Sequence, residues 1–221
     1  MNKVALDLIH SGQWPLCNPF MMSGMPLFAS LSFPLFYPGT LLFLILSQHQ
    51  ATMFLYWFQI TLAGYFTYRF SLLLQENQDS GNQPITYNHL SSIIAGLSFM
   101  FAGNVITLIY PGHTMKLIAA TFIPVAMYGI GKSFQSNKLS WFLMTGIILS
   151  IQIFTLHFQV CYYTWILIGL FVLAKLSKIV SQHFQANRLH LRTHSVVETY
   201  SPSFSGKVLL NLLIMVILIF G

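Results

Sequence analysis

Long apolar runs, separated by short polar stretches, make up most of this chain. A helix that crosses a bilayer needs about 20 predominantly apolar residues, so runs of this length predict membrane-spanning helices. Five runs follow residue 50, and a sixth, shorter run closes the sequence: residues 51–74, 88–110, 115–131, 139–157, 160–176 and 208–220. The pattern predicts an all-α fold, a polytopic bundle of transmembrane helices.

Polar turns between the runs predict where the chain reverses. Residues 75–87 have the composition of an exposed turn, Pro111-Gly112 ends the second span, and residues 131–138 form another turn. A tight turn at Phe158–Gln159 predicts an antiparallel hairpin between the fourth and fifth spans. Thr114 is expected to cap the helix that follows Pro111-Gly112.

The first 50 residues follow a different pattern. From Gly12 to Pro38 the segment is apolar and aromatic, yet it contains five prolines, each of which lacks an N–H donor and restricts the residue before it. A broken apolar segment cannot cross lipid, where every backbone polar group needs an internal partner. We therefore expect residues 1–50 to form an interfacial loop with short helices, one of them in residues 39–46.

Composition supports a membrane protein. The 221 residues are 55% hydrophobic and 6% charged, whereas globular domains are roughly 25% charged. The runs divide the chain into the loop of residues 1–50, a bundle of five spans at 51–176, a basic segment at 177–207, and a truncated sixth span at 208–221. Because that last run is short and no anchor precedes the loop, we expect a piece of a longer polytopic protein.

The basic residues set the orientation. Eight of the ten lie on one side of the predicted spans: Arg69, Lys132, Lys138, Lys175, Lys178, Arg188, Arg192 and Lys207. Lysine and arginine are enriched in cytoplasmic loops, so this side is expected to be cytoplasmic and the net charge of +6 needs no nucleic-acid partner. The loop of residues 1–50, the turn 111–116 and the turn 158–159 then share the extracytoplasmic face.

Two polar groups on that face are candidates for a site. A helix N-terminus after Pro111-Gly112, with His113 and Lys116 beside it, favours an anion such as a phosphate at headgroup level. The alternative is that Lys116 extends to the interface and His113 bonds to backbone. Around the hairpin, Gln152, Thr155 and Gln159 share a helical face if the helix continues that far, with His157 and Tyr162 nearby. These side chains could instead form interhelical hydrogen bonds.

Carboxylates are scarce on the same face. Asp7 is the only one expected there. A reaction that needs a general base on that side therefore has Asp7, His113 or His157 available, or a residue outside this chain.

Several motifs in order resemble the YfhO family of bacterial membrane proteins, within the GT-C superfamily of membrane glycosyltransferases. They are Gly12-x-x-Pro15-Leu16-x-Asn18-Pro19, Gly24-Met25-Pro26, Phe36-Tyr37-Pro38, Gly112-His113-x-x-Lys116-Leu117 with Pro124, and His157-x-Gln159-x-x-Tyr162-Tyr163. The resemblance covers residues 12–176. The family's acidic motif lies upstream of the first of these motifs, after a spanning helix, and we expect it outside this chain.

The resemblance implies an integral, multi-pass protein of the bacterial cytoplasmic membrane. It would transfer a sugar from a polyprenyl-phosphate donor to a cell-envelope glycopolymer, among membrane lipids and with no nucleic acid. Asp7, His113 and His157 would be the catalytic candidates, and Trp14, Asn18, His113, Lys116, Gln159 and Tyr162 would bind substrate. No cofactor is implied, a divalent metal stays open, and we expect residues 1–221 alone to be inactive. The alternative function is a transporter or lipid-handling protein without chemistry.

Overall fold

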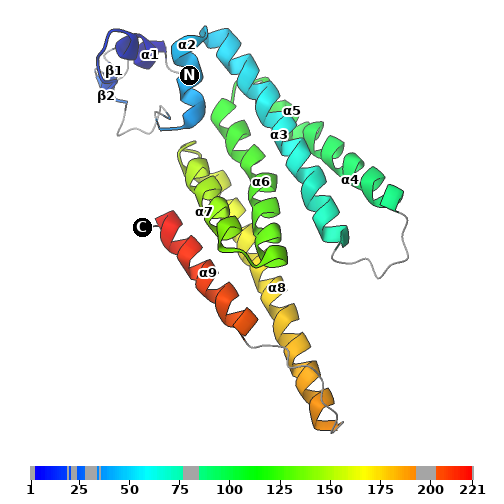
Figure 1. The fold of residues 1–221 in the computed structure, drawn as a ribbon. Helices are drawn as coiled ribbons and strands as arrows, with labels where there is room; N and C mark the ends of the chain where they lie inside the picture. The colour runs from blue at the N-terminus through cyan, green and yellow to red at the C-terminus, as the bar shows by residue number, and fades with distance from the viewer. Residues whose placement is uncertain are drawn as a thin grey trace.

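The computed structural model describes residues 3–18, 20, 24–27, 34, 36–76, 85–192 and 203–220. This part of the chain is mainly helical, as the apolar runs predict, and Figure 1 shows the helices as an elongated bundle. Much of the predicted loop 12–38, residues 77–84 of the predicted turn 75–87 and residues 193–202 of the basic segment 177–207 lie outside the described residues.

The N-terminal residues form a small unit at one end of the bundle (Figure 1). Its elements are α1 (Lys3–His10), β1 (Cys17–Asn18), β2 (Met25–Pro26), the 3-10 helix η1 (Pro38–Leu41) and α2 (Leu42–Ile45). The two strands pair antiparallel, with Cys17 opposite Pro26. The sequence predicts a short helix in residues 39–46, and η1 and α2 occupy residues 38–45. Apolar side chains of this unit, including Leu6 and Phe43, pack in one cluster with Ile118 of the bundle.

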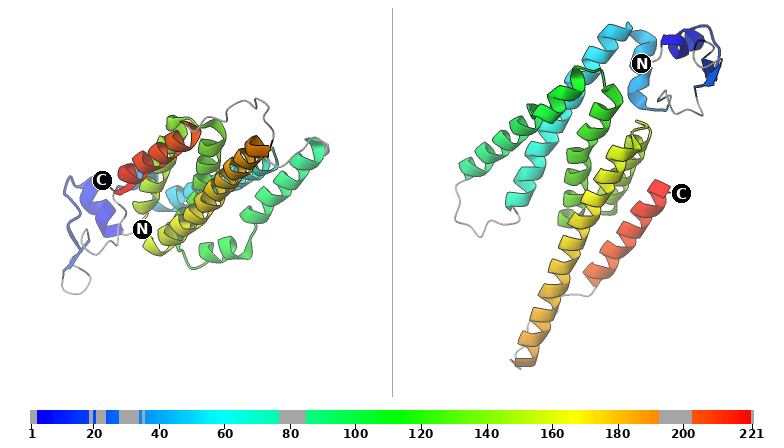
Figure 2. Two further views of the ribbon diagram at one scale, coloured as in Figure 1. Left: turned by 90° about the horizontal axis from the view of Figure 1, so that it is seen from below. Right: turned by 180° about the vertical axis from the view of Figure 1, so that it is seen from behind.

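The remaining helices form the bundle. They are α3 (Gln48–Glu76), α4 (Ile85–Met100), α5 (Gly103–Ile109), α6 (Thr114–Ser136), α7 (Leu139–Ile153), α8 (Phe158–Arg192) and α9 (Ser203–Phe220). Helix α6 is the central element, because it contacts α3, α5, α7 and α8 and most of its side chains are buried. Figure 2 shows α8 extending well beyond the other helices at the end away from the N-terminal unit.

Helices α3 and α6 run in the same direction, as their polar contacts show. The hydroxyls of Tyr56 and Thr114 lie 2.9 Å apart, and farther along both helices Arg69 Nη2 donates to the hydroxyl of Tyr128 at 3.1 Å. The start of α3 therefore meets the start of α6 at one end of the bundle. In the chain between them, the α4–α5 segment runs in the opposite direction, and α4 packs against α3.

Within the described residues, three segments are long and apolar enough to span a membrane: 86–109, 114–136 and 158–182. The sequence predicts five spans. Helix α7 has 15 residues, fewer than the roughly 20 that a span needs. Helix α3 has 29 residues but is enriched in glutamine, tyrosine and other polar side chains. The described helices thus support a membrane protein, and the fourth and first predicted spans stay predictions.

The helices differ in detail from the predicted spans. The second span is interrupted at Ala102, whose ψ of 132° is extended rather than helical. Helix α6 continues past residue 131 and ends where Asn137 adopts a left-handed φ of 50°. Helix α8 continues past residue 176 to Arg192, because no glycine or proline interrupts its polar part.

Candidate functional site

A shallow hollow lies where the N-terminal unit meets the starts of α6 and α8. Its lining residues are Pro34, Gly112, His113, Thr114, Met115, Lys116 and His157. Three of the predicted site residues, His113, Lys116 and His157, thus come together at one place. Two of them lie on the turn before α6 and in its first turn, and the third lies on the turn between α7 and α8.

The turn before α6 is fixed by backbone hydrogen bonds. The N–H of His113 donates to the carbonyl of Leu108 at 3.1 Å, and the N–H of Gly112 donates to that of Ile109 at 3.1 Å. This is the Schellman pattern, which ends a helix sharply and needs a left-handed residue, here Gly112 with a φ of +73°. The sequence predicts this break, and its result is that α6 begins at Thr114, immediately beside His113.

Thr114 does not cap α6 as predicted. It is the first helical residue, and His113 occupies the capping position without a side-chain hydrogen bond to the helix. The Thr114 hydroxyl instead lies 2.9 Å from the hydroxyl of Tyr56 on α3, which ties the turn to the bundle. No described side chain accepts a hydrogen bond from the first-turn N–H groups, so the positive end of α6 stays available to an anion.

His157 reaches the same hollow from the other side. Helix α7 ends at Ile153, and the chain turns through Leu156, which has a left-handed φ of 61°. Gln152, Thr155 and Gln159 were expected to share a face only if the helix continued that far, and this condition is not met, because α7 ends before Thr155 and α8 begins after it. The His157 side chain is half-buried, and its Nδ1 atom is buried without a hydrogen-bond partner among the described residues.

The hollow carries positive charge. Burial lowers the pKa of His157, and the neighbouring Lys116 ammonium and His113 lower that pKa further, whereas the residue's own backbone raises it. A neutral imidazole beside a lysine ammonium and a helix N-terminus suits an anionic group. With a volume of about 260 Å³, the hollow is smaller than the roughly 300–1,000 Å³ of pockets that enclose a whole small molecule. An open hollow of this volume can admit a charged group such as a phosphate.

Buried hydrogen bonds fix the segment that contains Pro34, which lines the hollow. The Tyr37 hydroxyl accepts a hydrogen bond from Gln59 Nε2 at 2.6 Å, and Thr121 donates to Gln59 Oε1 at 2.7 Å. Burial raises the pKa of Tyr37 to about 12, although the Gln59 hydrogen bond lowers it. The carbonyl of Pro34 accepts from the Thr40 hydroxyl at 2.6 Å and from the Tyr37 N–H at 3.2 Å. Sequence reasoning missed these residues, although a glutamine inside an apolar run is a usable signal.

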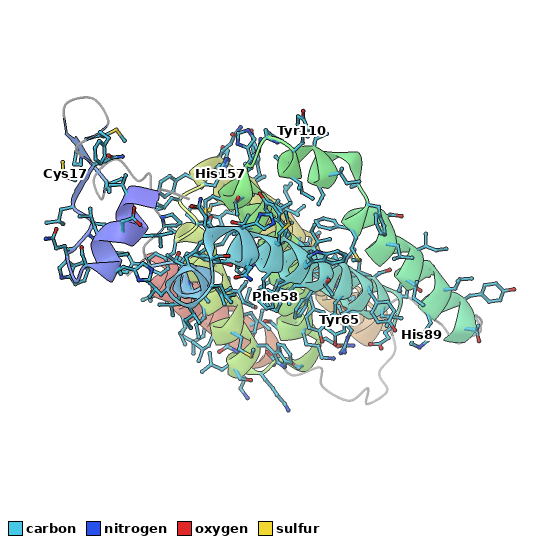
Figure 3. The ribbon with its side chains drawn as sticks, turned by 90° about the horizontal axis from the view of Figure 1, so that it is seen from above. Cys17, Phe58, Tyr65, His89, Tyr110 and His157 are labelled. Atoms are coloured by element: carbon cyan, nitrogen blue, oxygen red, sulfur yellow. The ribbon has the colours of Figure 1, made fainter. Side chains whose placement is uncertain are left out.

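The other predicted site residues lie elsewhere. Asp7 is exposed on α1 and does not line the hollow. Trp14 lines a separate, mainly apolar hollow with Ile9 and Leu44. Asn18 is buried, and its Oδ1 accepts from the N–H of Phe20 at 3.0 Å in a local turn. Figure 3 shows Cys17, beside Asn18, on the strand unit and apart from His157.

The two remaining candidates lie on the exposed first turns of α8. Gln159 Nε2 donates to the Tyr163 hydroxyl at 3.2 Å, and the rings of Tyr162 and Tyr163 are in contact. Gln152, by contrast, is buried and bonds Ala119 and Thr164, each at 2.8 Å. For this residue the alternative interpretation, an interhelical hydrogen bond, is confirmed.

Comparisons with protein-family models, with curated proteins and with solved structures find no match to this chain. Within the described residues, no group of three or more histidine, cysteine, aspartate or glutamate side chains is arranged to hold a metal ion. The functional conclusion therefore rests on the hollow itself.

Proposed function

We propose that the hollow at His113, Lys116 and His157 binds the phosphate of a polyprenyl-phosphate donor, as part of a GT-C-type glycosyltransferase that acts on a cell-envelope acceptor outside the cytoplasm. The observation that carries the proposal is the meeting of a lysine, two histidines and an uncapped helix N-terminus in one hollow. The predicted orientation puts this end of the bundle at the outer headgroup level, where a lipid-linked phosphate lies.

Binding of undecaprenyl phosphate to the purified chain in neutral detergent tests the proposal, with undecaprenol as the matched lipid that lacks the phosphate. Lys116→Ala should weaken binding of the phosphate form by about 1.5–3 kcal/mol, because a charge-assisted hydrogen bond is lost. The control Lys138→Ala removes an exposed lysine at the start of α7 and should change nothing. Equal binding of both lipids, or unchanged affinity in Lys116→Ala, would contradict the proposal and favour a lysine that only extends to the interface.

Transfer chemistry requires a base in addition to the phosphate site. General-base catalysis contributes roughly 10²–10⁴-fold, provided that the base is positioned at the acceptor. No carboxylate lines the hollow among the described residues, and His157, with its lowered pKa, is the basic group at hand. This observation also favours a second candidate function, a lipid-handling protein that binds the donor without chemistry.

Sugar transfer from a labelled polyprenyl-phosphate donor separates the two functions. The expected result for residues 1–221 is donor binding without transfer. Turnover that Asp7→Asn abolishes would show that Asp7 is the base after all. Turnover that survives Asp7→Asn and is lost in His157→Gln would instead assign the base to His157.

A further inference from the structure

A second polar hollow lies near the far end of α3 and α6, where α4 begins. It is lined by Tyr68, Arg69, Leu72, Leu73, Glu76, His89, Tyr128 and Lys132. Figure 3 labels His89 and Tyr65 on this side of the bundle, away from Cys17. The proposed function uses none of these residues.

Arg69 is the central cation of this hollow. Its guanidinium donates to the hydroxyls of Tyr65 and Tyr128, at 3.0 and 3.1 Å, and lies over both rings, 5.8 and 5.5 Å from their centroids. A guanidinium has five N–H donors, so the two tyrosines hold it in place and leave donors for another acceptor. Because Arg69 lines the hollow and is only half-buried, an acceptor in the hollow can reach it.

Neither cation of the hollow has an anionic partner among the described residues. Lys132 Nζ donates to Gln135 Oε1 at 2.6 Å, and Gln135 Nε2 in turn donates to Glu76 Oε2 at 3.3 Å. Glu76 is thus held at one edge through an amide rather than by an ion pair. On the opposite wall, the Tyr68 hydroxyl lies 2.9 Å from His89 Nδ1. Arginine, lysine and tyrosine hydroxyls together form a donor set that suits phosphate oxygens.

The position of the hollow along α6 corresponds to a membrane interface. Lys116 and Lys132 lie on the same helix, and their separation of sixteen positions corresponds to roughly 24 Å of helix axis. The hydrocarbon core of a bilayer is about 30 Å thick. If the Lys116 hollow lies near one headgroup layer, the Arg69–Lys132 hollow lies near the other. Basic pockets between membrane helices bind anionic headgroups at this level.

We propose that the Arg69–Lys132 hollow binds the phosphodiester of an anionic phospholipid headgroup. Arg69 and Lys132 contact the phosphate oxygens, and the tyrosine hydroxyls orient the guanidinium. Glu76 disfavours a second negative charge, so that a singly charged diester is preferred to a dianionic monoester. The Glu76 carboxylate can also accept a hydrogen bond from a headgroup hydroxyl.

Native mass spectrometry of the full chain tests the proposal by measuring retention of phosphatidylglycerol against phosphatidylcholine with the same acyl chains. We expect preferential retention of phosphatidylglycerol, and a loss of about ten-fold in Arg69→Gln and in Lys132→Gln. Lys132→Gln removes one exposed hydrogen bond, to Gln135, and should not disturb folding. This variant therefore tests the proposal even if Arg69→Gln fails to fold. Lys138→Gln removes a lysine outside the hollow and is the matched control.

The soluble headgroup distinguishes the source of the phosphate. Glycerophosphoglycerol, which carries the same diester without acyl chains, should not compete at millimolar concentration if the ligand is a lipid. Competition that both variants weaken would support the phosphate site and assign it to a soluble diester. Equal retention of the two phospholipids by the unmodified chain, or unchanged retention in Lys132→Gln, would overturn the proposal.

Discussion

His157 is partly buried and has two basic neighbours, so its protonation should change the stability of the folded protein. The pKa of this side chain is lowered from the ordinary value of 6.5, first by burial and then by Lys116 and His113. The folded protein thus binds this proton less tightly than the unfolded chain. As the pH falls below about 6.5, the unfolded state takes up more protons, and the free energy of unfolding decreases.

His157→Gln should remove this contribution. We expect the melting temperature of the unmodified chain in detergent to fall between about pH 7.5 and pH 5.5, and to fall less in His157→Gln. His49→Gln, which changes an exposed histidine outside the hollow, is the control. Undecaprenyl phosphate should reduce the acid sensitivity, since a bound anion favours the charged imidazole. Identical pH dependence in both proteins would contradict the lowered pKa.

Only some of the side-chain positions at the site could be predicted from the sequence. The joint placement of His113 and Lys116 was predictable, because both follow a Pro-Gly helix break at short spacing. Their position in the same hollow as His157 was expected only as a shared membrane face. The network of Tyr37, Gln59 and Thr121 was not predictable, because it joins residues 22 and 62 positions apart, and a single sequence contains no information on such pairs.

At the scale of helices, α3 and α4 pack closely through two glycines. A Cβ atom added at Gly96 would lie 2.8 Å from the backbone oxygen of Gly64, which is too close for any real contact. Small residues let membrane helices approach in this way. The same contact positions α4, whose His89 lines the Arg69–Lys132 hollow.

Gly96→Ala should separate α3 from α4. We expect a loss of about 1–3 kcal/mol in the free energy of unfolding, because the clash is with backbone and cannot be relieved by rotating a side chain. The control Gly169→Ala adds the same methyl group on α8, where no atom lies within 4 Å, and should be neutral or slightly stabilising. Thermal unfolding in detergent measures both. Equal stability of the two variants would mean that the α3–α4 contact is looser than the structure shows.

Helix positions were more predictable than helix ends. Apolar runs located the helices of the bundle, because burial or lipid contact favours such runs whatever the neighbours are. The extension of α8 to Arg192 and of α6 to Ser136 involves polar residues with ordinary helix propensity, which the hydropathy pattern does not detect. The interruption at Ala102 coincides with Gly103, a signal that the uninterrupted apolar run concealed.

At the scale of the whole molecule, the two polar hollows lie toward opposite ends of α6, with apolar helix surface between them. The exposed apolar side chains of α4 and α8, such as Ile94 and Leu170, are in keeping with a lipid environment for that surface. The distribution of lysine and arginine predicts which of the two hollows faces the cytoplasm. The charge pattern predicts that the Arg69–Lys132 end is cytoplasmic.

Cysteine labelling tests this orientation. Ser11, Lys138 and Ser181 are all exposed in the structure, so a cysteine at any of them should react with an impermeant thiol reagent after solubilisation in detergent. The native thiols, exposed Cys17 and buried Cys161, are first replaced. In sealed cells, only the cysteine at position 11 should react, because the other two positions lie behind the membrane. The detergent sample controls for local shielding, so a lack of labelling in cells shows that the membrane blocks the reagent.

Reaction at position 181 in sealed cells would show that the orientation is the reverse of the predicted one. The Lys116 hollow would then face the cytoplasm. A donor for extracytoplasmic transfer could not bind there.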